Sequence, residues 1–254
     1  MVITSISNEK VKLFRSLTES KGRKERGLYL AEGYNLVKDI PASAAVRYLF
    51  LKESKAEAYA SEFARFGAET IVLSDELFDR VSDTVTPWGV AAVLEIPKST
   101  DISELNEDKL IVLDHLSDAG NVGAILRTAV AAGYRQAVLL ECADPYSPKA
   151  VRSSMSAIFK IDLSFSDNKS FLCSKNIKKY DIMVLDMAGE SIFDYAPKGK
   201  FALVVGNEAH GVSPDLKAAC RKLSIPMRSM ESLNAAVSAS VAMYLIEKNL
   251  QSKF

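Results

Sequence analysis

Three segments between residues 118 and 242 combine residue types that could bind a ligand or do chemistry. The first, D-A-G-N-V-G-A-I-L-R-T-A at 118–129, follows an apolar run and opens a helical pattern. Asn121 can cap the new helix, and Gly123 lets a ligand approach the backbone closely. The free N–H groups and positive dipole of a helix start suit an anion, and Arg127 would project from the same end. An ordinary capped turn with a surface arginine is the alternative.

A second segment, V-V-G-N-E-A-H-G-V-S at 204–213, runs from a buried strand through a glycine and places Glu208 just beyond it. Ligands of open α/β sheets bind outside the carboxyl ends of the strands. A third, I-P-M-R-S-M-E-S-L-N-A-A-V-S-A-S-V-A at 225–242, offers Ser232 or Asn234 as the cap of a helix rich in small residues. Such a helix permits close approach of another helix or of threaded chain. A polar turn and an Ala-rich packing helix remain alternatives for these two segments.

Several other kinds of site lack support. The chain has no G-x-G-x-x-G and no G-K-[ST], which argues against a Rossmann dinucleotide site and a Walker phosphate loop. Its histidines, His115 and His210, are isolated, so a zinc protease or a Ser-His-Asp triad is not indicated. The three cysteines lack C-x-x-C spacing, which predicts free thiols in a reducing, cytoplasmic setting and no metal site. No apolar run reaches ~18 residues, so no membrane partner is expected.

The elements that position these segments alternate between strand and helix. Strands are expected at 111–114, 136–140, 180–187, 201–206 and 223–226, with helices at 121–132, 149–159 and 232–249. This rhythm predicts a parallel sheet with helices on both faces. Before the polar stretch 97–110, a smaller α/β sandwich is expected, with strands at 28–33, 46–51, 70–74 and 88–96 and helices at 8–17, 34–40, 54–67 and 75–82. We place the domain boundary near residue 105, giving domains 1–105 and 106–254.

Composition is that of a globular chain, and charge becomes informative only locally. Hydrophobic residues make up 48% and charged residues 25% of the 254 residues, which excludes a disordered or fibrous chain. The net charge is zero, so net charge gives no argument for a nucleic-acid partner. Residues 1–26, however, carry seven Lys or Arg against three Glu, a local charge of +4. Gly22 and Gly27 bracket a basic loop with Arg23, Lys24 and Arg26, and Lys21 comes just before it; these four cations suit phosphate contacts or a solvated face.

In this order, the three segments resemble the three motifs of the SpoU/TrmH family of RNA ribose 2′-O-methyltransferases, within the SPOUT superfamily. N-V-G-A-I-L-R-T-A matches motif one, G-N-E-A-H-G-V motif two, and I-P-M with E-S-L-N motif three, and the match covers roughly 107–250. The N-terminal stretch, with K-G-R-K-E-R-G-L-Y-L-A-E-G and P-W-G-V-A-A-V, looks like the family's ribosomal-protein-like substrate-binding domain.

The resemblance implies a C-terminal trefoil knot, S-adenosylmethionine as the cofactor, and a homodimer with its site near the subunit interface. It implies rRNA or tRNA as the substrate, with the N-terminal cations as RNA contacts. By motif position, cofactor contacts are expected at Gly206, Ile225, Met227 and Leu233. Catalytic or RNA-contacting roles carry over to Asn121, Arg127, Glu208, Ser232 and Asn234. Because the pKa of a guanidinium exceeds ~12, Arg127 should hold the target phosphate and hydroxyl, oriented by Asn121 and Glu208.

The chain also departs from the family pattern. Ala209 stands where motif two usually has Gly, Val212 where it has Leu, and Ser156 where a Gly is common. In motif three the turn after I-P-M is short and Gly-free, so the loop beside the cofactor should run differently. These changes leave a non-catalytic RNA-binding relative as an alternative, and another nucleotide-binding α/β enzyme as a more distant one. The retained motif residues favour an active enzyme.

Overall fold

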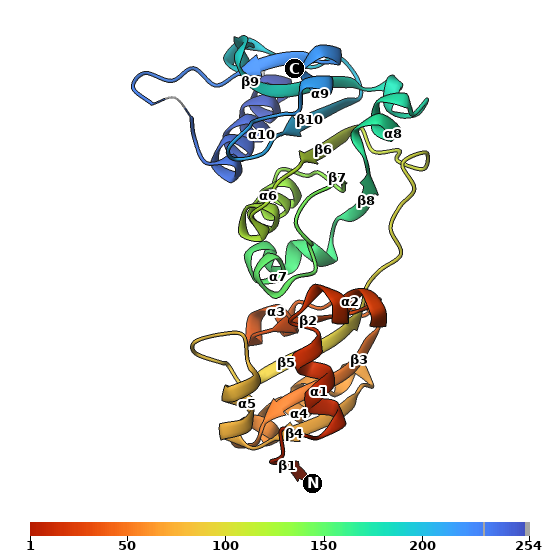
Figure 1. The fold of residues 1–254 in the computed structure, drawn as a ribbon, viewed down its shortest axis with the longest axis vertical. Coiled ribbons are helices and arrows are strands. Elements are labelled where there is room, and N and C mark those ends of the chain that lie inside the picture. The colour runs from red at the N-terminus through yellow and green to blue at the C-terminus, as the bar shows by residue number, and fades with distance from the viewer. Residues whose placement is uncertain (231, 252–254) are drawn as a thin grey trace. The chain divides into compact units, whose positions relative to one another are not determined.

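The computed structural model describes residues 1–230 and 232–251. Their contacts divide the chain into two units (Figure 1): unit 1 combines 1–97 with 144–159, and unit 2 combines 98–143 with the chain from 160 onward. The boundary expected near residue 105 stays a prediction, and the structure adds that 144–159 groups with unit 1. None of the described helices is long and apolar enough to cross a membrane.

Unit 1 is built on a five-stranded sheet in the order β1-β4-β3-β5-β2. Its strands are β1 (Val2–Ile3), β2 (Leu28–Glu32), β3 (Val46–Lys52), β4 (Glu69–Leu73) and β5 (Val90–Glu95). Strand β5 runs antiparallel to both neighbours, whereas β1, β4 and β3 are parallel. The sheet is mixed because β5 lies between β3 and β2 and runs in the opposite direction to both.

Helices cover the sheet of unit 1. They are α1 (Glu9–Ser16), α2 (Ser20–Arg26), α3 (Tyr34–Lys38), α4 (Ala56–Phe63), α5 (Asp75–Val81) and α7 (Pro148–Ser154), with short 3-10 turns η1 (Glu53–Lys55), η2 (Ala64–Phe66) and η3 (Met155–Phe159). On one face, Phe14 of α1 and Phe78 of α5 pack edge-to-face against each other and join the same core as Phe50 of β3. Burial of these apolar groups is what holds the layers together.

Unit 2 is built on a six-stranded sheet in the order β11-β9-β10-β6-β7-β8, in which every pair is parallel. The strands are β6 (Lys109–Asp114), β7 (Gln136–Leu140), β8 (Asp162–Ser166), β9 (Asp181–Ser191), β10 (Phe201–Val205) and β11 (Arg221–Ser224). The inner strands β7 and β10 are buried along their whole length, as continuous apolar strands of parallel sheets are. The predicted parallel sheet with helices is confirmed.

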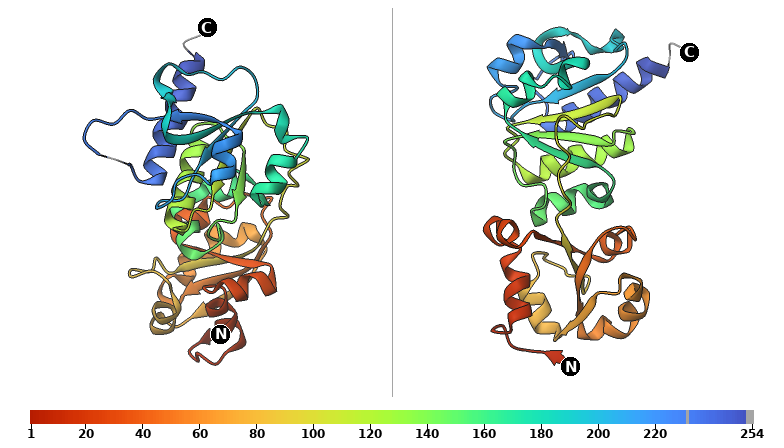
Figure 2. Two further views of the ribbon diagram at one scale, coloured as in Figure 1. Left: turned by 45° about the horizontal axis from the view of Figure 1, so that its top comes forward. Right: turned by 90° about the vertical axis from the view of Figure 1, so that its right-hand side faces the viewer.

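The helices of unit 2 are α6 (Ala119–Ala131), α8 (Asn168–Cys173), α9 (Pro214–Ala219) and α10 (Ala235–Gln251), with 3-10 turns η4 (Ile177–Lys179) and η5 (Ile192–Asp194). Phe171 of α8 and Leu216 of α9 share one core with Val112 and Val204 of the sheet. Helices α6 and α10 pack against each other (Figure 2), and the hydroxyl of Ser240 donates to that of Thr128 at 3.0 Å. The small residues of α10 allow this close approach.

Some local expectations were wrong. The basic segment expected as a loop is helix α2, in which the glycine at 22 packs closely: a Cβ there would lie 2.0 Å from the carbonyl oxygen of Ser16. Strand β8 and helices α8 and α9 were not predicted, because each mixes polar and apolar residues over a short segment and has too little periodicity to stand out. Helix α10 begins at Ala235 rather than at residue 232.

Candidate functional site

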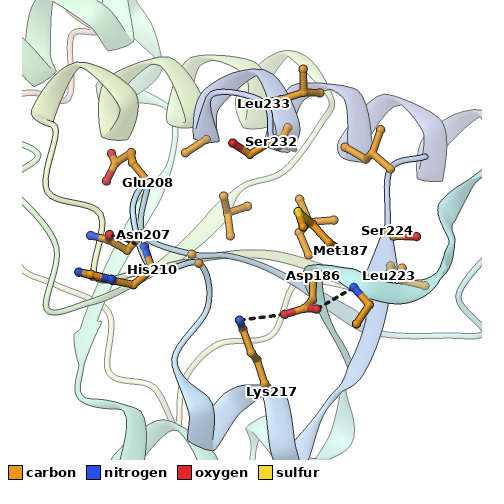
Figure 3. Close-up of a pocket in the computed structure, with 18 of the residues that line it drawn as sticks. Asp186, Met187, Asn207, Glu208, His210, Lys217, Leu223, Ser224, Ser232 and Leu233 are labelled. Atoms are coloured by element: carbon orange, nitrogen blue, oxygen red, sulfur yellow. Dashed lines mark hydrogen bonds and ion pairs between the residues drawn. The ribbon is translucent and has the colours of Figure 1, made fainter. Parts of the chain in front are cut away.

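A cavity of about 470 Å³ lies in unit 2, where β9 and β10 end and the chain leaves β11 (Figure 3). Its volume is in the range of small-molecule sites, roughly 300–1,000 Å³. The four residues predicted as cofactor contacts, Gly206, Ile225, Met227 and Leu233, all line it, although no bound group tests that role. Segments far apart in the sequence therefore meet at one cavity, as the carboxyl ends of parallel strands require.

The cavity wall is apolar with a few fixed polar groups. Leu185, Val205 and Leu223 contribute apolar side chains. On the side away from Ser232 and Leu233, Asp186 forms an ion pair with Lys217 at 2.9 Å (Figure 3). The hydrogen bond from this lysine holds the pKa of the Asp186 carboxyl below its ordinary value. Sequence reasoning missed this pair, and the only signal was an acidic residue directly after the apolar run 182–185.

Gly206 is required where β10 leaves the sheet. A Cβ at this position would lie 2.1 Å from the backbone nitrogen of Val212 and 2.2 Å from the carbonyl carbon of Gly211. The loop returns this closely because Asn207 and Gly211 exchange backbone hydrogen bonds of 3.0 and 2.9 Å. The close return forms one rim of the cavity and presents Glu208 at its tip.

Glu208 is held by four hydrogen-bond donors from the start of α6. Asn121 donates from Nδ2 to one carboxylate oxygen at 2.8 Å, and the backbone N–H of Asp118 donates to the same oxygen at 3.4 Å. Ser117 donates its hydroxyl to the other oxygen at 3.1 Å and its backbone N–H at 3.4 Å. Motif two is thereby tied to motif one.

The protonation state of Glu208 follows from these contacts. Partial burial acts to raise the pKa of the Glu208 carboxyl, but the hydrogen bonds from Asn121 and Ser117 favour the anion and together lower it below the ordinary value. Glu208 is therefore an anion at neutral pH, and its lone pairs are directed at donors of its own chain. This arrangement suits Glu208 to the role of positioning its neighbours, and it is less suited to accepting a proton from the substrate.

The third motif joins the same network through Asn234. Its Nδ2 donates to Oδ1 of Asn121 at 3.1 Å, and its own Oδ1 accepts from the backbone of Ala236 at 2.9 Å. Asn234 is thus the cap of α10, for which the sequence offered Ser232 or Asn234.

Asn121 was expected to cap α6, but it does not. Asp118 accepts from the Asn121 backbone at 2.9 Å and caps that helix instead. The Asn121 side chain is left free to link Glu208 with Asn234.

Arg127 is not brought into this network. It is exposed, is absent from the cavity lining, and forms no hydrogen bond or ion pair with the residues that the structure describes. The expectation that Asn121 and Glu208 orient it is not met within one chain. Six residues along an α-helix turn the direction by about 240° and advance by about 9 Å, so Arg127 projects from a different face of α6 than Asn121.

His115 joins two strand ends beside the site. Its Nδ1 lies 2.6 Å from Oδ1 of the buried Asp114, and its Nε2 lies 3.1 Å from Oε2 of Glu141. His115 (φ 56°) and Glu141 (φ 50°) both adopt positive φ angles that favour glycine. The His115 carbonyl accepts from Nδ2 of Asn207 at 2.7 Å, which fixes the residue before Glu208. Isolated in sequence, this histidine gave no signal of its structural position.

The basic residues predicted to contact RNA separate into two kinds. Lys21, Lys24 and Arg26 are exposed on α2. Arg23 is 3% exposed, pairs with Asp144 at 2.6 Å and donates to the carbonyl of Leu17 at 2.9 Å. A buried, fully engaged guanidinium is not available to a phosphate, so the expectation for Arg23 was wrong.

Two family models match the chain. Residues 108–244 match the SpoU rRNA Methylase family, and residues 8–92 match the MRM3-like substrate binding domain.

In the described part of the chain, no group of three or more His, Cys, Asp or Glu side chains is arranged to hold a metal ion.

Known relatives match along the whole chain. The Bacillus subtilis protein named 23S rRNA (guanosine(2553)-2′-O)-methyltransferase RlmP is 30% identical over 95% of this chain and 97% of its own. The crystal structure of the SpoU methyltransferase AviRb from Streptomyces viridochromogenes in complex with the cofactor AdoMet superposes with a TM-score of 0.86, at 25% identity, over 96% of this chain and 99% of that one. A putative RNA methyltransferase of the TrmH family from Porphyromonas gingivalis gives a TM-score of 0.84 at 28% identity, over 96% and 99%. With both the motifs and the fold in common, the chain belongs to the SpoU rRNA methylase family.

Proposed function

We propose that the protein transfers a methyl group from S-adenosylmethionine to a ribose 2′-hydroxyl of RNA, with ribosomal RNA as the favoured substrate. The observation that carries this proposal is the meeting of motifs two and three at one cavity, with Asn121 of motif one hydrogen-bonded to both Glu208 and Asn234. The Bacillus subtilis relative is named as an enzyme that methylates 23S rRNA. Membership of the family and this shared site support the same chemistry here.

The cavity fits the proposed cofactor. Its apolar side chains suit an adenosine moiety, and the anionic Glu208 at its rim suits a cationic sulfonium. The only lysine in the lining, Lys217, is neutralised by Asp186, so no free positive charge opposes a cation. Gly206, Ile225, Met227 and Leu233 would hold the cofactor, and bound S-adenosylmethionine supplies an electrophilic methyl group. The AdoMet complex of the AviRb relative supports this assignment.

The chain's own residues orient the reacting hydroxyl. A ribose 2′-hydroxyl is a poor nucleophile, so the site must align it and stabilise the negative charge that develops on its oxygen. The anionic Glu208 fixes Asn121, and Asn121 in turn fixes Asn234 beside Ser232. A guanidinium stays protonated, so Arg127 would bind the target phosphate and hydroxyl rather than accept the proton.

A homodimer explains why Arg127 lies outside the cavity of its own chain. We infer that the site is completed at a subunit interface formed by α10 and its surroundings. Val237 and Tyr244 are 47% and 52% exposed and lie two helical turns apart on the same face of α10. Exposed apolar side chains in register along one helix are typical of a protein interface.

We also infer that the chain from β11 into α10 forms the trefoil knot of the family, because β11 pairs with β9 at the sheet edge while α10 returns to α6.

The decisive experiment measures binding and methyl transfer separately. Calorimetry of the full chain with S-adenosylmethionine should show binding, and ribose-methylation profiling of RNA from a deletion strain should reveal one lost site. Absence of cofactor binding at millimolar concentration would instead favour a non-catalytic RNA-binding relative.

Arg127→Ala should abolish methyl transfer to RNA while leaving the fold and the cofactor affinity intact, because the side chain touches neither the core nor the cavity of its own chain. The matched control is Arg135→Ala, which removes another exposed arginine of unit 2 and should keep full activity. Near-normal turnover of the Arg127 variant would remove this residue from the mechanism.

A further inference from the structure

The loop between α5 and β5 presents the protein's single tryptophan to solvent. Trp88 is 66% exposed, and Val85 in the same loop is completely exposed. An isolated exposed apolar residue needs no explanation, but an indole ring is costly to leave in water and is enriched where proteins bind. Whether Trp88 can serve as a binding site therefore depends on whether contacts with the rest of unit 1 hold this loop in one conformation.

A buried carboxylate fixes the start of this loop. Glu32, at the end of β2, is 7% exposed and accepts from the hydroxyl of Thr84 at 2.8 Å and from the hydroxyl of Ser82. The backbone N–H of Asp83 donates to its other oxygen at 3.3 Å. A buried carboxylate is tolerated only with such partners, so these contacts tie consecutive loop residues to the sheet.

Two further contacts fix the rest of the loop. The carboxylate of Asp83 pairs with Arg152 at 2.7 Å within unit 1. Immediately after Trp88, Gly89 is buried with φ 81° and its carbonyl accepts from the backbone of Lys52 at 2.9 Å. The exposed ring is thus held between anchored residues on both sides. Less conformational entropy is then lost when a ligand stacks on it.

Two lysine side chains lie beside Gly89, the residue that follows Trp88. A Cβ at Gly89 would lie 3.0 Å from Cβ of Lys52 and 3.0 Å from Cγ of Lys55. The ammonium of Lys52 is neutralised by Asp79 at 2.7 Å. Lys55 is exposed and forms no ion pair with any residue in the described part of the chain. An exposed indole, followed by a residue that packs beside the stem of a lysine without an ion pair, matches the chemistry of single-stranded nucleic acid, where a base stacks and the adjoining phosphate binds a cation.

We propose that Trp88 is a stacking platform for an unpaired base of the RNA substrate, with Lys55 contacting the adjoining phosphate. The proposal rests on the proposed function, since it takes RNA as the ligand, and it adds a recognition site in unit 1 that the methyl-transfer cavity of unit 2 does not contain. The base must be unstacked, as in a loop or bulge, because in a duplex each base is stacked between its neighbours and leaves no open face for the indole. Specific recognition would then favour a loop or bulge.

The protein supplies its own reporter for this contact. Because Trp88 is the only tryptophan, indole fluorescence of the full chain reports on this ring alone. Titration with a short single-stranded oligoadenylate should quench the emission in a saturable way. The same measurement with a blunt RNA duplex should leave the emission unchanged.

Variants separate stacking from charge. Affinity for single-stranded RNA, measured by anisotropy of a labelled oligonucleotide, should fall about 5- to 150-fold for Trp88→Ala and much less for Trp88→Phe. Lys55→Gln should weaken binding less and make it less sensitive to salt. Phe165→Ala, which removes an aromatic side chain 49% exposed in unit 2, is the matched control and should bind as the wild type does.

The outcomes distinguish this inference from the proposed function. If the protein binds and methylates RNA while emission stays constant and Trp88→Ala binds normally, the platform is wrong and the methyltransferase assignment stands. If emission changes only with protein concentration, Trp88 lies at a contact between copies of the chain, which also overturns the inference. If the wild type methylates no RNA yet is quenched by single strands, the stacking site stands and the proposed activity fails.

Discussion

At the scale of single residues, Glu208 is the group whose role the structure clarifies most. The sequence places it beyond the end of a strand, where a carboxylate could be a base, a ligand or part of a turn. Its four donors from residues 117, 118 and 121, together with its lowered pKa, make it an anion that holds motif one in place. We therefore assign it a positioning role.

Glu208→Ala should slow methyl transfer by roughly tenfold or more, because a hydrogen bond to a charged group is worth about 1.5–3 kcal/mol. Glu208→Gln should fall between this variant and the wild type, since it keeps the shape but loses the charge. Single-turnover rates at saturating cofactor measure the effect, with the exposed Glu57→Gln as the control. A variant as fast as the wild type would make Glu208 a turn residue only.

His115 predicts a pH dependence of stability. The hydrogen bond with Asp114 raises the pKa of His115 above its ordinary value of 6.5, and the nearby Glu141 adds to the shift. A group with a raised pKa stabilises the fold fully below its unfolded pKa and loses that contribution as the pH rises through the folded pKa. The free energy of unfolding should therefore decline from pH 6.5 upward, measured by urea denaturation at each pH.

The control for this prediction is His115→Asn, because asparagine tolerates the positive φ at this position but cannot titrate. This variant should lack the decline. An equal decline in both proteins would show that the ion pairs of His115 do not contribute.

At the scale of elements, the apolar strands were predictable and the polar strand β8 was not. Strands β7 and β10 have five residues without a charge, and β6 has a run of four apolar residues between a lysine and an aspartate. By contrast, β8 carries an aspartate and two serines, and it belongs to the sheet because it pairs with the edge of β7. Helix α2 escaped prediction because a run of charges and a glycine resemble a loop, whereas the close packing of Gly22 on Ser16 favours a helix.

Gly206→Ala should disrupt the loop at the rim of the cavity. The new Cβ would meet the backbone of Gly211 and Val212, which cannot move without breaking the return of the loop. We expect a loss of stability of about 1–3 kcal/mol and loss of cofactor binding, measured by denaturation and calorimetry. Gly27→Ala in unit 1 is the control: its φ of 64° strains a side chain, but no atom lies within 4 Å. It should lose stability while cofactor affinity stays unchanged, and an intact cavity in the Gly206 variant would contradict the prediction.

At the scale of the whole molecule, one chain holds the cavity and the carboxylate–amide network but leaves Arg127 outside. The exposed apolar residues of α10 give a physical reason for association, since their burial between two chains would remove apolar surface from water. A dimer would then be a condition of activity and not only of stability.

Tyr244→Glu should therefore convert a dimer to a monomer in analytical ultracentrifugation and lower methyl transfer at least tenfold, because burying an unpaired charge at an interface costs about 1–3 kcal/mol or more. Phe165→Glu, which alters an exposed aromatic residue of β8 at the edge of the sheet opposite β11, is the control and should stay dimeric. Full activity in a monomeric variant would place the complete site within one chain.

The sequence by itself determined the family motifs, their order and the buried strands of the parallel sheet, because these depend on local apolar patterns and on residue type. Only the tertiary structure decided that Asp118 caps α6 so that Asn121 can bridge Glu208 and Asn234. It also decided that Arg23 is buried against Asp144 while Trp88 stays exposed on an anchored loop. These outcomes depend on partners up to 121 residues apart in the chain, and no local pattern carries information about such pairs.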